Sequence, residues 1–456
     1  MKSTFAAIST GLTNSGISIV RMSGENSVSI IDKVFKAKSG KLIKEEKSHT
    51  IHYGHIYDED KIIDEVLVMY MKGPNSYTGE DTIEVNCHGG VLVTRKVLEI
   101  LIKAGARAAE PGEFTKTAFL NGKIDLSQAE AVMDVINAKT EYALNTSIKQ
   151  LNGNVYNKIK EIREKIIYEI AFIESALDDP EHYSTLGYSE KLKPIINELI
   201  VKIKDLLKSV NNGKILKEGI NTVIVGKPNA GKSSLLNLLI GEEKAIVTDI
   251  AGTTRDVLEE TIILNGIMLN IIDTAGIRNT QEVVEKIGVE RAIDYANNAD
   301  LILYVVDSSK ELDESDDRII DILKEKNVII LLNKADLETV VDENIITQKL
   351  DKKVICISAK ENKGIDELEN EIRDMFLEGQ IEFNDEVYIT NARHVDELNQ
   401  AYDSLNMVLS SIEEDMPEDF YSIDLMNCYE HLGNIIGESV EEDLVNEIFD
   451  KFCMGK

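Results

Sequence analysis

The sequence has few cysteines and no long hydrophobic run. Its four cysteines, at positions 87, 356, 428 and 453 of 456 residues, form no CxxC pair, which argues against a disulfide framework and a structural zinc site. The longest apolar runs, such as "VIILL" from Val328, are much shorter than the roughly 20 residues that a membrane helix needs. The first residues, "MKSTFAAIST", have the character of neither a signal peptide nor a transit peptide. These absences predict a cytoplasmic protein without a membrane partner.

Basic residues are scarce relative to acidic ones. The chain has 50 Lys and Arg against 81 Asp and Glu, which gives a net charge of -31. Binding to phosphate backbones depends on Lys and Arg displacing counterions, so a nucleic-acid substrate requires a local basic patch or a partner protein. The length, with 43% hydrophobic residues, is sufficient for two to four domains.

The period of the hydrophobic pattern divides the chain into three regions. Residues 1–120 mix short strand-like runs with a helical stretch, which predicts an α+β domain. Residues 121–217 are helical, and helical periodicity returns over 376–456. Between them, residues 218–375 alternate strand and helix, as in a doubly wound α/β unit. We therefore expect a multidomain α/β protein in which the 218–375 module is inserted into a discontinuous helical domain.

The inserted module begins with a phosphate-binding motif. "INTVIVGKPNAGKSSLLNLL" is an apolar strand, then Gly-x4-Gly-Lys-Ser, then a helix, which is the context that a P-loop requires. In such a loop the backbone wraps the phosphates, Lys232 reaches the β and γ oxygens, and Ser233 ligates magnesium. The predicted nucleotide contacts in this motif are Asn229, Ala230, Gly231, Lys232, Ser233 and Ser234.

Two motifs suited to magnesium and the γ-phosphate follow. "TDIAGTTRD" offers Thr254 as a second magnesium ligand, and "DTAG" offers Asp273 for the metal's water shell and Gly276 beside the γ-phosphate. A hairpin with an Asn265-Gly266 turn separates them. The nucleotide-binding residues assigned to these two motifs are Thr248, Asp249, Ile250, Ala251, Gly252, Thr253, Thr254, Asp273, Thr274, Ala275 and Gly276.

The remaining motifs point to guanine. "VIILLNKAD" brings Asn333, Lys334 and Asp336 to a strand end, where the Asp336 carboxylate suits the N1-H and N2 amino groups of guanine. "CISAK" adds Ser358, Ala359 and Lys360 at a second strand end. The order and spacing of all these motifs predict a protein that binds and hydrolyses GTP.

The hydrolytic machinery departs from that of Ras-like enzymes. Ile277 stands where those enzymes have a glutamine, so another group must orient the attacking water. Asn229 and the segment "TDIAGTT" can line a second cation site, where a monovalent ion supplies the charge that an arginine finger otherwise brings. From spacing alone, an Asn229 that only braces the loop explains the sequence equally well.

The combination of motifs resembles the MnmE (TrmE) family of tRNA modification GTPases. The resemblance rests on "GKPNAGKSS", on "TDIAGTTRD" followed by "DTAGIR", and on the terminal "FCMGK". The blocks "GISIVRMSG", "PNSYTGEDTIEVNCHGG" and "PGEFTKTAFLNGKIDLSQAEAV" resemble the family's N-terminal and early helical regions, so the similarity extends over nearly the whole chain.

This resemblance implies a homodimer joined through N-terminal domains similar to tetrahydrofolate-binding aminomethyltransferases. It also implies G domains that meet across potassium ions during GTP hydrolysis. Together with a partner that uses FAD and NADH, in a heterotetramer-type complex, the family adds a carboxymethylaminomethyl-type group to C5 of the wobble uridine of certain tRNAs. The implied one-carbon donor is 5-formyl- or methylene-tetrahydrofolate.

The resemblance also assigns roles to individual residues. The implied magnesium ligands are Ser233 and Thr254, and the water-positioning residue is Glu285. By sequence alone Glu285 is an ordinary solvated helix residue, with Glu282 and Glu290 equally suitable. The implied potassium ligands are Asn229, Thr248, Ile250 (through its carbonyl) and Thr253. The implied folate contacts, each of which taken singly reads as a surface or capping residue, are Arg21, Glu80, Lys123 and Lys456.

Cys453 has two interpretations. The family ends in Cys-x-Gly-Lys, usually with Ile where this chain has Met454, and the cysteine is implicated in the modification. A thiolate is a good nucleophile towards a pyrimidine C6 or a one-carbon unit, and a flexible tail can carry it to the base. Alternatively, Cys453 is a small apolar residue that packs against the last helix. Cys87, in contrast, is expected in the core.

Two other functional classes remain open. One is a regulatory or ribosome-assembly GTPase that acts as a switch without chemistry on a base, although it leaves the N-terminal blocks and the terminal thiol unexplained. The other is a folate-dependent one-carbon transferase with an attached GTPase and a different acceptor. Binding of formyltetrahydrofolate would distinguish a tRNA-modifying enzyme from the switch GTPase. Loss of the wobble modification without this protein would distinguish it from a one-carbon transferase with another acceptor.

Overall fold

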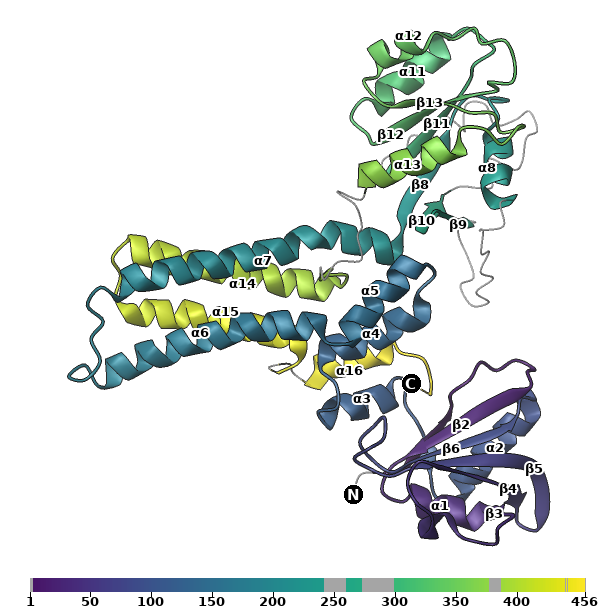
Figure 1. Cartoon of the computed structure of the whole chain (residues 1–456), viewed down its shortest axis with the longest axis vertical. Coiled ribbons are helices and arrows are strands. Elements are labelled where there is room, and N and C mark those ends of the chain that lie inside the picture. Colours follow the sequence, from purple (N-terminus) through teal and green to yellow (C-terminus); the bar gives the residue numbers. More distant parts are fainter. Residues whose placement is uncertain are drawn as a thin grey trace. The chain divides into compact units, whose positions relative to one another are not determined.

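The computed structural model describes residues 3–241, 260–272, 299–376, 387–438, 440 and 442–455. The chain forms two compact units (Figure 1). The first unit consists of Met1–Ile136, Ile148–Ile203 and Asp396–Lys456. The second consists of Asn137–Ser147 and Lys204–Val395.

A seven-stranded sheet forms the N-terminal part of the first unit. Its strand order is β3-β4-β5-β6-β2-β1-β7, and all neighbours are antiparallel except β1 and β7. Helices α1 and α2 pack together against one face, which confirms the predicted α+β domain. The elements are β1 Phe5–Ile8, β2 Ile17–Ser23, α1 Ser27–Val34, β3 Phe35–Ala37, the 3-10 helix η1 Ile43–Glu45, β4 Thr50–Asp58, β5 Lys61–Met71, β6 Thr82–His88, α2 Val91–Ala104 and β7 Arg107–Ala108.

The two faces of this sheet differ. Strand alternation buries residues such as Val68 and Val85 under α1 and α2, and Cys87 lies in the same core as predicted. On the opposite face, Tyr53 lies directly across from Leu67, and both side chains are exposed. The second face of the sheet is therefore open and partly apolar.

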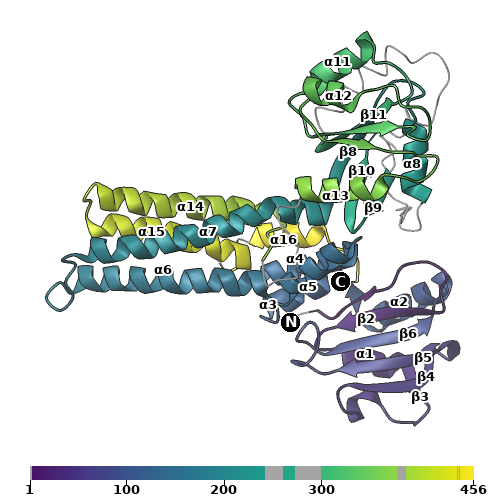
Figure 2. The same cartoon turned by 45° about the horizontal axis from the view of Figure 1, so that its top comes forward.

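The rest of the first unit is helical. Helices α6, α7, α14 and α15 are long and lie side by side in both views (Figures 1 and 2). Helix α6 buries Ile159, Ile166 and Ile173, which recur on one face at the spacing of two turns. Within the described residues, no helix is both long and apolar enough to cross a membrane. The helices that lie wholly or almost wholly in the first unit are α3 Glu113–Leu120, α4 Leu126–Asn137, α6 Asn154–Asp178, α15 Glu418–Ile436 and α16 Glu442–Asp450. Three further helices are divided between the two units: α5 Glu141–Leu151, which belongs mostly to the second unit, α7 Tyr188–Glu218 and α14 Ala392–Glu413.

The second unit contains a six-stranded sheet of order β13-β12-β11-β8-β10-β9. All neighbouring strands are parallel except β9 and β10, and the middle strands β11 and β12 are buried along their whole length. This confirms the predicted P-loop type of α/β module. The elements are β8 Ile220–Val225, α8 Lys232–Gly241, β9 Glu260–Leu264, β10 Ile267–Ile271, β11 Leu301–Asp307, α11 Glu314–Leu323, β12 Val328–Asn333, α12 Glu343–Lys349, β13 Val354–Cys356 and α13 Ile365–Phe376.

The predicted Asn265-Gly266 turn joins β9 and β10. Both residues have positive φ, 48° for Asn265 and 83° for Gly266, as a type I′ hairpin turn requires. The hairpin prediction is confirmed.

Candidate functional site

The P-loop connects β8 to α8. Gly226 has φ 154°, and a Cβ there would clash with the carbonyl oxygen of Val305 on the neighbouring strand β11. Gly231 has φ 101° and lies against the side chain of Asn333, so it also has no room for a Cβ. Asn229 adopts φ 62°, a left-handed conformation that asparagine tolerates better than most residues. The loop therefore has the tight backbone path of a phosphate cradle.

Lys232 already points at this loop. Its Nζ donates hydrogen bonds to the carbonyl oxygens of Gly226, at 2.6 Å, and Lys227, at 2.8 Å. Burial lowers the pKa of Lys232, because the charged form is partly removed from water. A partly desolvated ammonium group interacts strongly with an incoming phosphate, since the local screening is weaker than in bulk water.

Asn333 links three of the predicted motifs. It lies at the end of β12 and is 2% exposed. Its Nδ2 donates to the carbonyl oxygen of Ala230 in the P-loop, at 2.9 Å. Its Oδ1 accepts from the backbone N–H of Ala359, at 3.2 Å. The phosphate-binding and base-recognition segments thus form one hydrogen-bonded structure.

Asp336 is held as an ionised acceptor. The hydroxyl of Ser358 donates to Asp336 Oδ1 at 2.8 Å, and this hydrogen bond lowers the pKa of Asp336. A carboxylate can accept from both N–H groups on the guanine edge. Lys334, with φ 67°, pairs through Nζ with Asp307 Oδ2 at 2.6 Å. Burial raises the pKa of Asp307, but the hydrogen bonds from Lys334 and Ser309 outweigh it, so the net shift is downward.

A further network braces the P-loop and was not predicted. Lys227 Nζ pairs with Asp313 Oδ2 at 2.9 Å and with Asp316 Oδ2 at 2.6 Å, both at the start of α11. Asp316 is buried and also accepts from the hydroxyl of Tyr304 on β11, at 3.0 Å. The two aspartates form a capping box, which the sequence indicates through their spacing, but capping gives no hint of the lysine partner.

Several predicted residues lie outside the described residues. They comprise most of the magnesium, potassium and γ-phosphate assignments, the water-positioning glutamate with its two alternatives, and one folate contact. These residues are Thr248, Asp249, Ile250, Ala251, Gly252, Thr253, Thr254, Asp273, Thr274, Ala275, Gly276, Ile277, Glu282, Glu285, Glu290 and Lys456.

A second candidate site lies in the first unit, around Arg21. Its Nε donates to Glu84 Oε1 at 2.7 Å across the β2–β6 pair. The guanidinium group also lies 5.8 Å from the ring centroid of Tyr77 and 5.5 Å from that of Phe114. Glu84 was not predicted, although it occupies the outward position between the buried residues Ile83 and Val85 of its strand.

The loop formed by residues 73–81 brings the other folate candidates to this area. Thr78 anchors it through a hydroxyl–hydroxyl hydrogen bond of 2.7 Å with Ser23, two residues after Arg21. Lys123 Nζ donates to the carbonyl oxygen of Pro74 at 3.0 Å. Glu80 belongs to the same loop. Arg21, Glu80 and Lys123 therefore border one loop, and their role as folate contacts stays a prediction.

The segment around Cys453 is fixed against the N-terminal part of the first unit. Gly112 N–H donates to the carbonyl oxygen of Cys453 at 3.4 Å, and Ser9 Oγ donates to that of Gly455 at 3.0 Å. A Cβ on Gly455 would clash with the carbonyl oxygen of Ile8, so only glycine fits there. Residues 453–455 are therefore held against this part of the unit, and whether the tail moves to a base stays a prediction.

The side chain of Cys453 itself is exposed. The residue that packs is Phe452, whose ring lies 4.9 Å from that of Phe449. The alternative prediction, in which Cys453 packs as a small apolar residue against the last helix, is therefore wrong. Ile8 adjoins Ala7, which pairs with Arg21 across β1 and β2, so this segment runs close to the Arg21 site.

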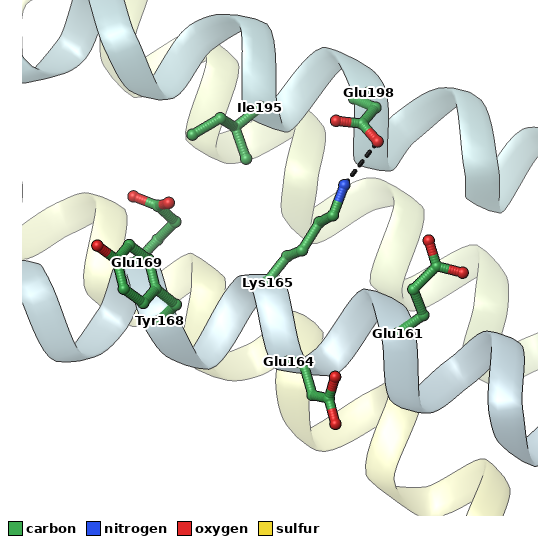
Figure 3. A pocket seen from close by; sticks show the side chains of 7 residues that line it. All are labelled: Glu161, Glu164, Lys165, Tyr168, Glu169, Ile195 and Glu198. Carbon is green, nitrogen blue, oxygen red and sulfur yellow. Dashed lines mark hydrogen bonds and ion pairs between the residues drawn. The ribbon is translucent and has the colours of Figure 1, made fainter.

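A hollow of about 490 Å³ on the helical part contains none of the predicted residues. It lies between α6 and α7, and Lys165 Nζ donates across it to Glu198 Oε1 at 2.6 Å (Figure 3). Its lining residues are Glu161, Glu164, Lys165, Tyr168, Glu169, Ile195 and Glu198. Among the described residues there is also no cluster of three or more His, Cys, Asp and Glu side chains suited to a metal.

Comparison with known proteins extends over the whole chain. Residues 4–123 match the family model of the GTP-binding protein TrmE N-terminus, and residues 126–453 match that of the MnmE helical domain. The chain is 58% identical over 454 residues to the tRNA modification GTPase MnmE of Lachnoclostridium phytofermentans, covering 99% of each. It is 50% identical to that of Clostridioides difficile, again covering 99% of each.

Proposed function

Since the chain belongs to the MnmE family of tRNA modification GTPases, we propose that it hydrolyses GTP to drive modification of a tRNA wobble uridine. The reaction adds a carboxymethylaminomethyl-type group to C5 and uses a tetrahydrofolate one-carbon unit. The observation that carries the proposal is the pair of hydrogen bonds made by Asn333, which join the P-loop to the base-recognition segments in a single site.

At the nucleotide site, each described residue has a chemical task. The P-loop accommodates the phosphates, and Lys232 shifts from the loop carbonyls to the phosphate oxygens. Asp336 accepts from the guanine edge, which selects GTP over ATP. Bound magnesium, held by Ser233 and Thr254, neutralises phosphate charge.

A potassium ion completes the hydrolytic site in this proposal. Asn229 lies in the P-loop with its backbone in the left-handed region, and its side-chain oxygen is one of the proposed ligands. Thr248, Ile250 and Thr253 supply the remaining oxygens. When bound there, potassium would supply the positive charge of an arginine finger. Glu285 would orient the attacking water in place of the glutamine that Ile277 replaces.

The folate is proposed to bind around the loop of residues 73–81. Glu80 accepts from the N–H edge of the pterin, while Arg21, Lys123 and Lys456 pair with the glutamate tail. Glu84 holds the guanidinium of Arg21 in place. Cys453, exposed on a fixed segment near Arg21, is the proposed nucleophile.

A second copy of this chain is proposed to cover the open face of the N-terminal sheet. Ile51, Tyr53 and Leu67 lie on that face and are 59%, 41% and 44% exposed. An antiparallel sheet normally turns polar residues to water, so such a face indicates an interface. The same face carries Arg21 and Glu84, which would bring the folate site close to the dimer interface.

Because the chain is strongly acidic, it needs cations from elsewhere to bind the phosphate backbone of tRNA. We propose that an FAD- and NADH-dependent partner, in a heterotetramer-type complex in the cytoplasm, supplies cationic contacts to the nucleic acid. The net charge of -31 supports this division of tasks.

The experiment that tests the proposal measures GTP hydrolysis in potassium chloride and in sodium chloride at equal ionic strength. We expect potassium to accelerate hydrolysis by about 10-fold or more, in line with the effect of an added charge at the transition state. Asn229→Gly and Glu285→Ala should lose this acceleration. The glycine variant removes the amide without the backbone strain that alanine would add at φ 62°.

Glu282→Ala is the matched control, because by sequence alone Glu282 is as suitable as Glu285 for the role of water-positioning residue. Equal rates in the two salts would remove the potassium mechanism. Binding of formyltetrahydrofolate and loss of the wobble modification in a deletion strain then test the remaining parts separately.

A further inference from the structure

The segment between Arg393 and Lys451 has an extreme composition. It contains no Lys or Arg but sixteen Asp and Glu, about half of the net charge of the chain. The segment includes α14, α15 and α16 of the first unit. These helices therefore carry a strong negative potential.

An apolar stripe runs along the outer face of α15. It consists of Phe420, Ile423 and Met426, which are spaced three residues apart and are 43%, 58% and 38% exposed. The inner face of the same helix carries Tyr421 and Leu425, which are fully buried. Among the residues that the structure describes, the stripe is therefore an additional apolar surface that no packing contact buries.

The charges beside the stripe are not compensated. Asp419 and Glu430 flank it on α15, and in the part of the chain that the structure describes neither forms an ion pair. The nearby cations have other partners: Lys193 pairs with Glu413 at 2.9 Å, and Arg163, which is buried, pairs with Glu438. An apolar stripe with acidic margins is complementary to an apolar face with basic margins.

We propose that this stripe docks an amphipathic helix of a partner protein whose apolar face is bordered by lysine or arginine. Nucleic acids and anionic lipid surfaces are excluded because the surrounding acidic residues repel them. A second copy of this chain is also disfavoured, since a symmetric contact would bring two such acidic surfaces together.

Fluorescence anisotropy with the full chain tests the proposal. The probe is a labelled 18-residue peptide of leucine and lysine in an amphipathic helical pattern, and a peptide of the same composition in scrambled order is the control probe. The stripe variant is Phe420→Gln with Ile423→Gln. The control variant is Val201→Gln. Val201 is a similarly exposed apolar residue on α7, but its neighbour in the sequence is the basic Lys202 rather than an acidic residue.

We expect the stripe variant to weaken binding of the amphipathic peptide by about 10-fold or more, which corresponds to roughly 1.4 kcal/mol. Val201→Gln should bind like the unchanged chain, and the scrambled peptide should bind weakly to all three. Equal binding by all variants, or equal binding of both peptides, would show non-specific attraction and overturn the proposal. So would a loss of self-association in the stripe variant during sedimentation, because a second copy would then be the occupant.

Discussion

The nucleotide site of the second unit and the Arg21 site of the first unit are built in different ways. The nucleotide site is assembled from loops that follow β8, β12 and β13, three parallel strands of one sheet, and each loop carries a recognisable motif. The Arg21 site joins β2, the 73–81 loop, the turn between α3 and α4 that carries Lys123, and residues 453–455, which are far apart in the sequence. A site at the ends of parallel strands can be predicted from motifs, whereas a site between distant segments depends on tertiary packing.

The first test of this contrast removes a buried aromatic ring from the first unit, which carries the Arg21 site, and leaves the nucleotide site unchanged. Phe449→Ala deletes a ring that is 1% exposed and contacts Phe119 and Phe452. We expect a loss of about 3–5 kcal/mol in the free energy of unfolding of the first unit, because a cavity remains. GTP affinity should stay within twofold. Phe420→Ala is the control, since that ring is exposed, and thermal melting combined with GTP titration measures both effects.

The second test removes the central charge of the nucleotide site. Lys232→Ala should lower kcat for GTP hydrolysis by about 10²–10³, because a preorganised cation at the developing phosphate charge is lost. Lys324→Ala, which removes the exposed lysine directly after α11, should have no effect. Unchanged hydrolysis in Lys232→Ala would contradict the assignment of the P-loop.

The third test uses the close approach of Gly455 to Ile8. Gly455→Ala introduces a methyl group where the carbonyl oxygen of Ile8 leaves no space, at a cost of about 1–3 kcal/mol. We expect tRNA modification to fall by about 10-fold or more while GTP hydrolysis continues. Gly40→Ala is a matched control, because its φ of 77° brings the same backbone strain but nothing lies near the added methyl group. Equal modification by both variants would separate residue 455 from the reaction.

The smallest expected effect concerns pH on the open face of the N-terminal sheet. A hydrogen bond of 2.7 Å with Asp64, together with the charge of that group, raises the pKa of His88. Because the folded-state pKa is the higher one, the stabilisation is fully present below the unfolded pKa and is lost as pH rises through the folded pKa.

An NMR titration of His88 measures this shift. Asp64→Asn should bring the His88 pKa back towards its ordinary value, whereas Asp60→Asn, in the exposed turn after β4, should leave it unchanged. An unaltered His88 pKa in Asp64→Asn would exclude the ion pair as its cause.

Much of the fold could be predicted because the signals are local. The period of the hydrophobic pattern locates the helical and α/β regions, and Asn265-Gly266 specifies its turn through backbone conformations that few other residue pairs adopt. Asn333, Asp336 and Ser358 could be identified as candidate site residues for a related reason, because each belongs to a motif with fixed spacing, and the structure brings these motifs together.

The remaining contacts could not be predicted because their partners are distant in sequence. Glu84 lies opposite Arg21 only once the register of β2 and β6 is known. Asp316 reaches Lys227 only when α11 packs beside the P-loop. The fixed position of Gly455 depends on Ile8, 447 residues earlier in the chain. No local pattern specifies such pairs.

The hydrogen bonds of Asn333 have a kinetic consequence. They hold the P-loop and the 358–360 turn in one arrangement before any nucleotide arrives. The entropy of ordering these segments is therefore lost during folding rather than during binding. We expect fast association with GTP and a small entropic penalty for binding the base, so that the rate of each hydrolytic cycle depends on steps after the nucleotide has entered.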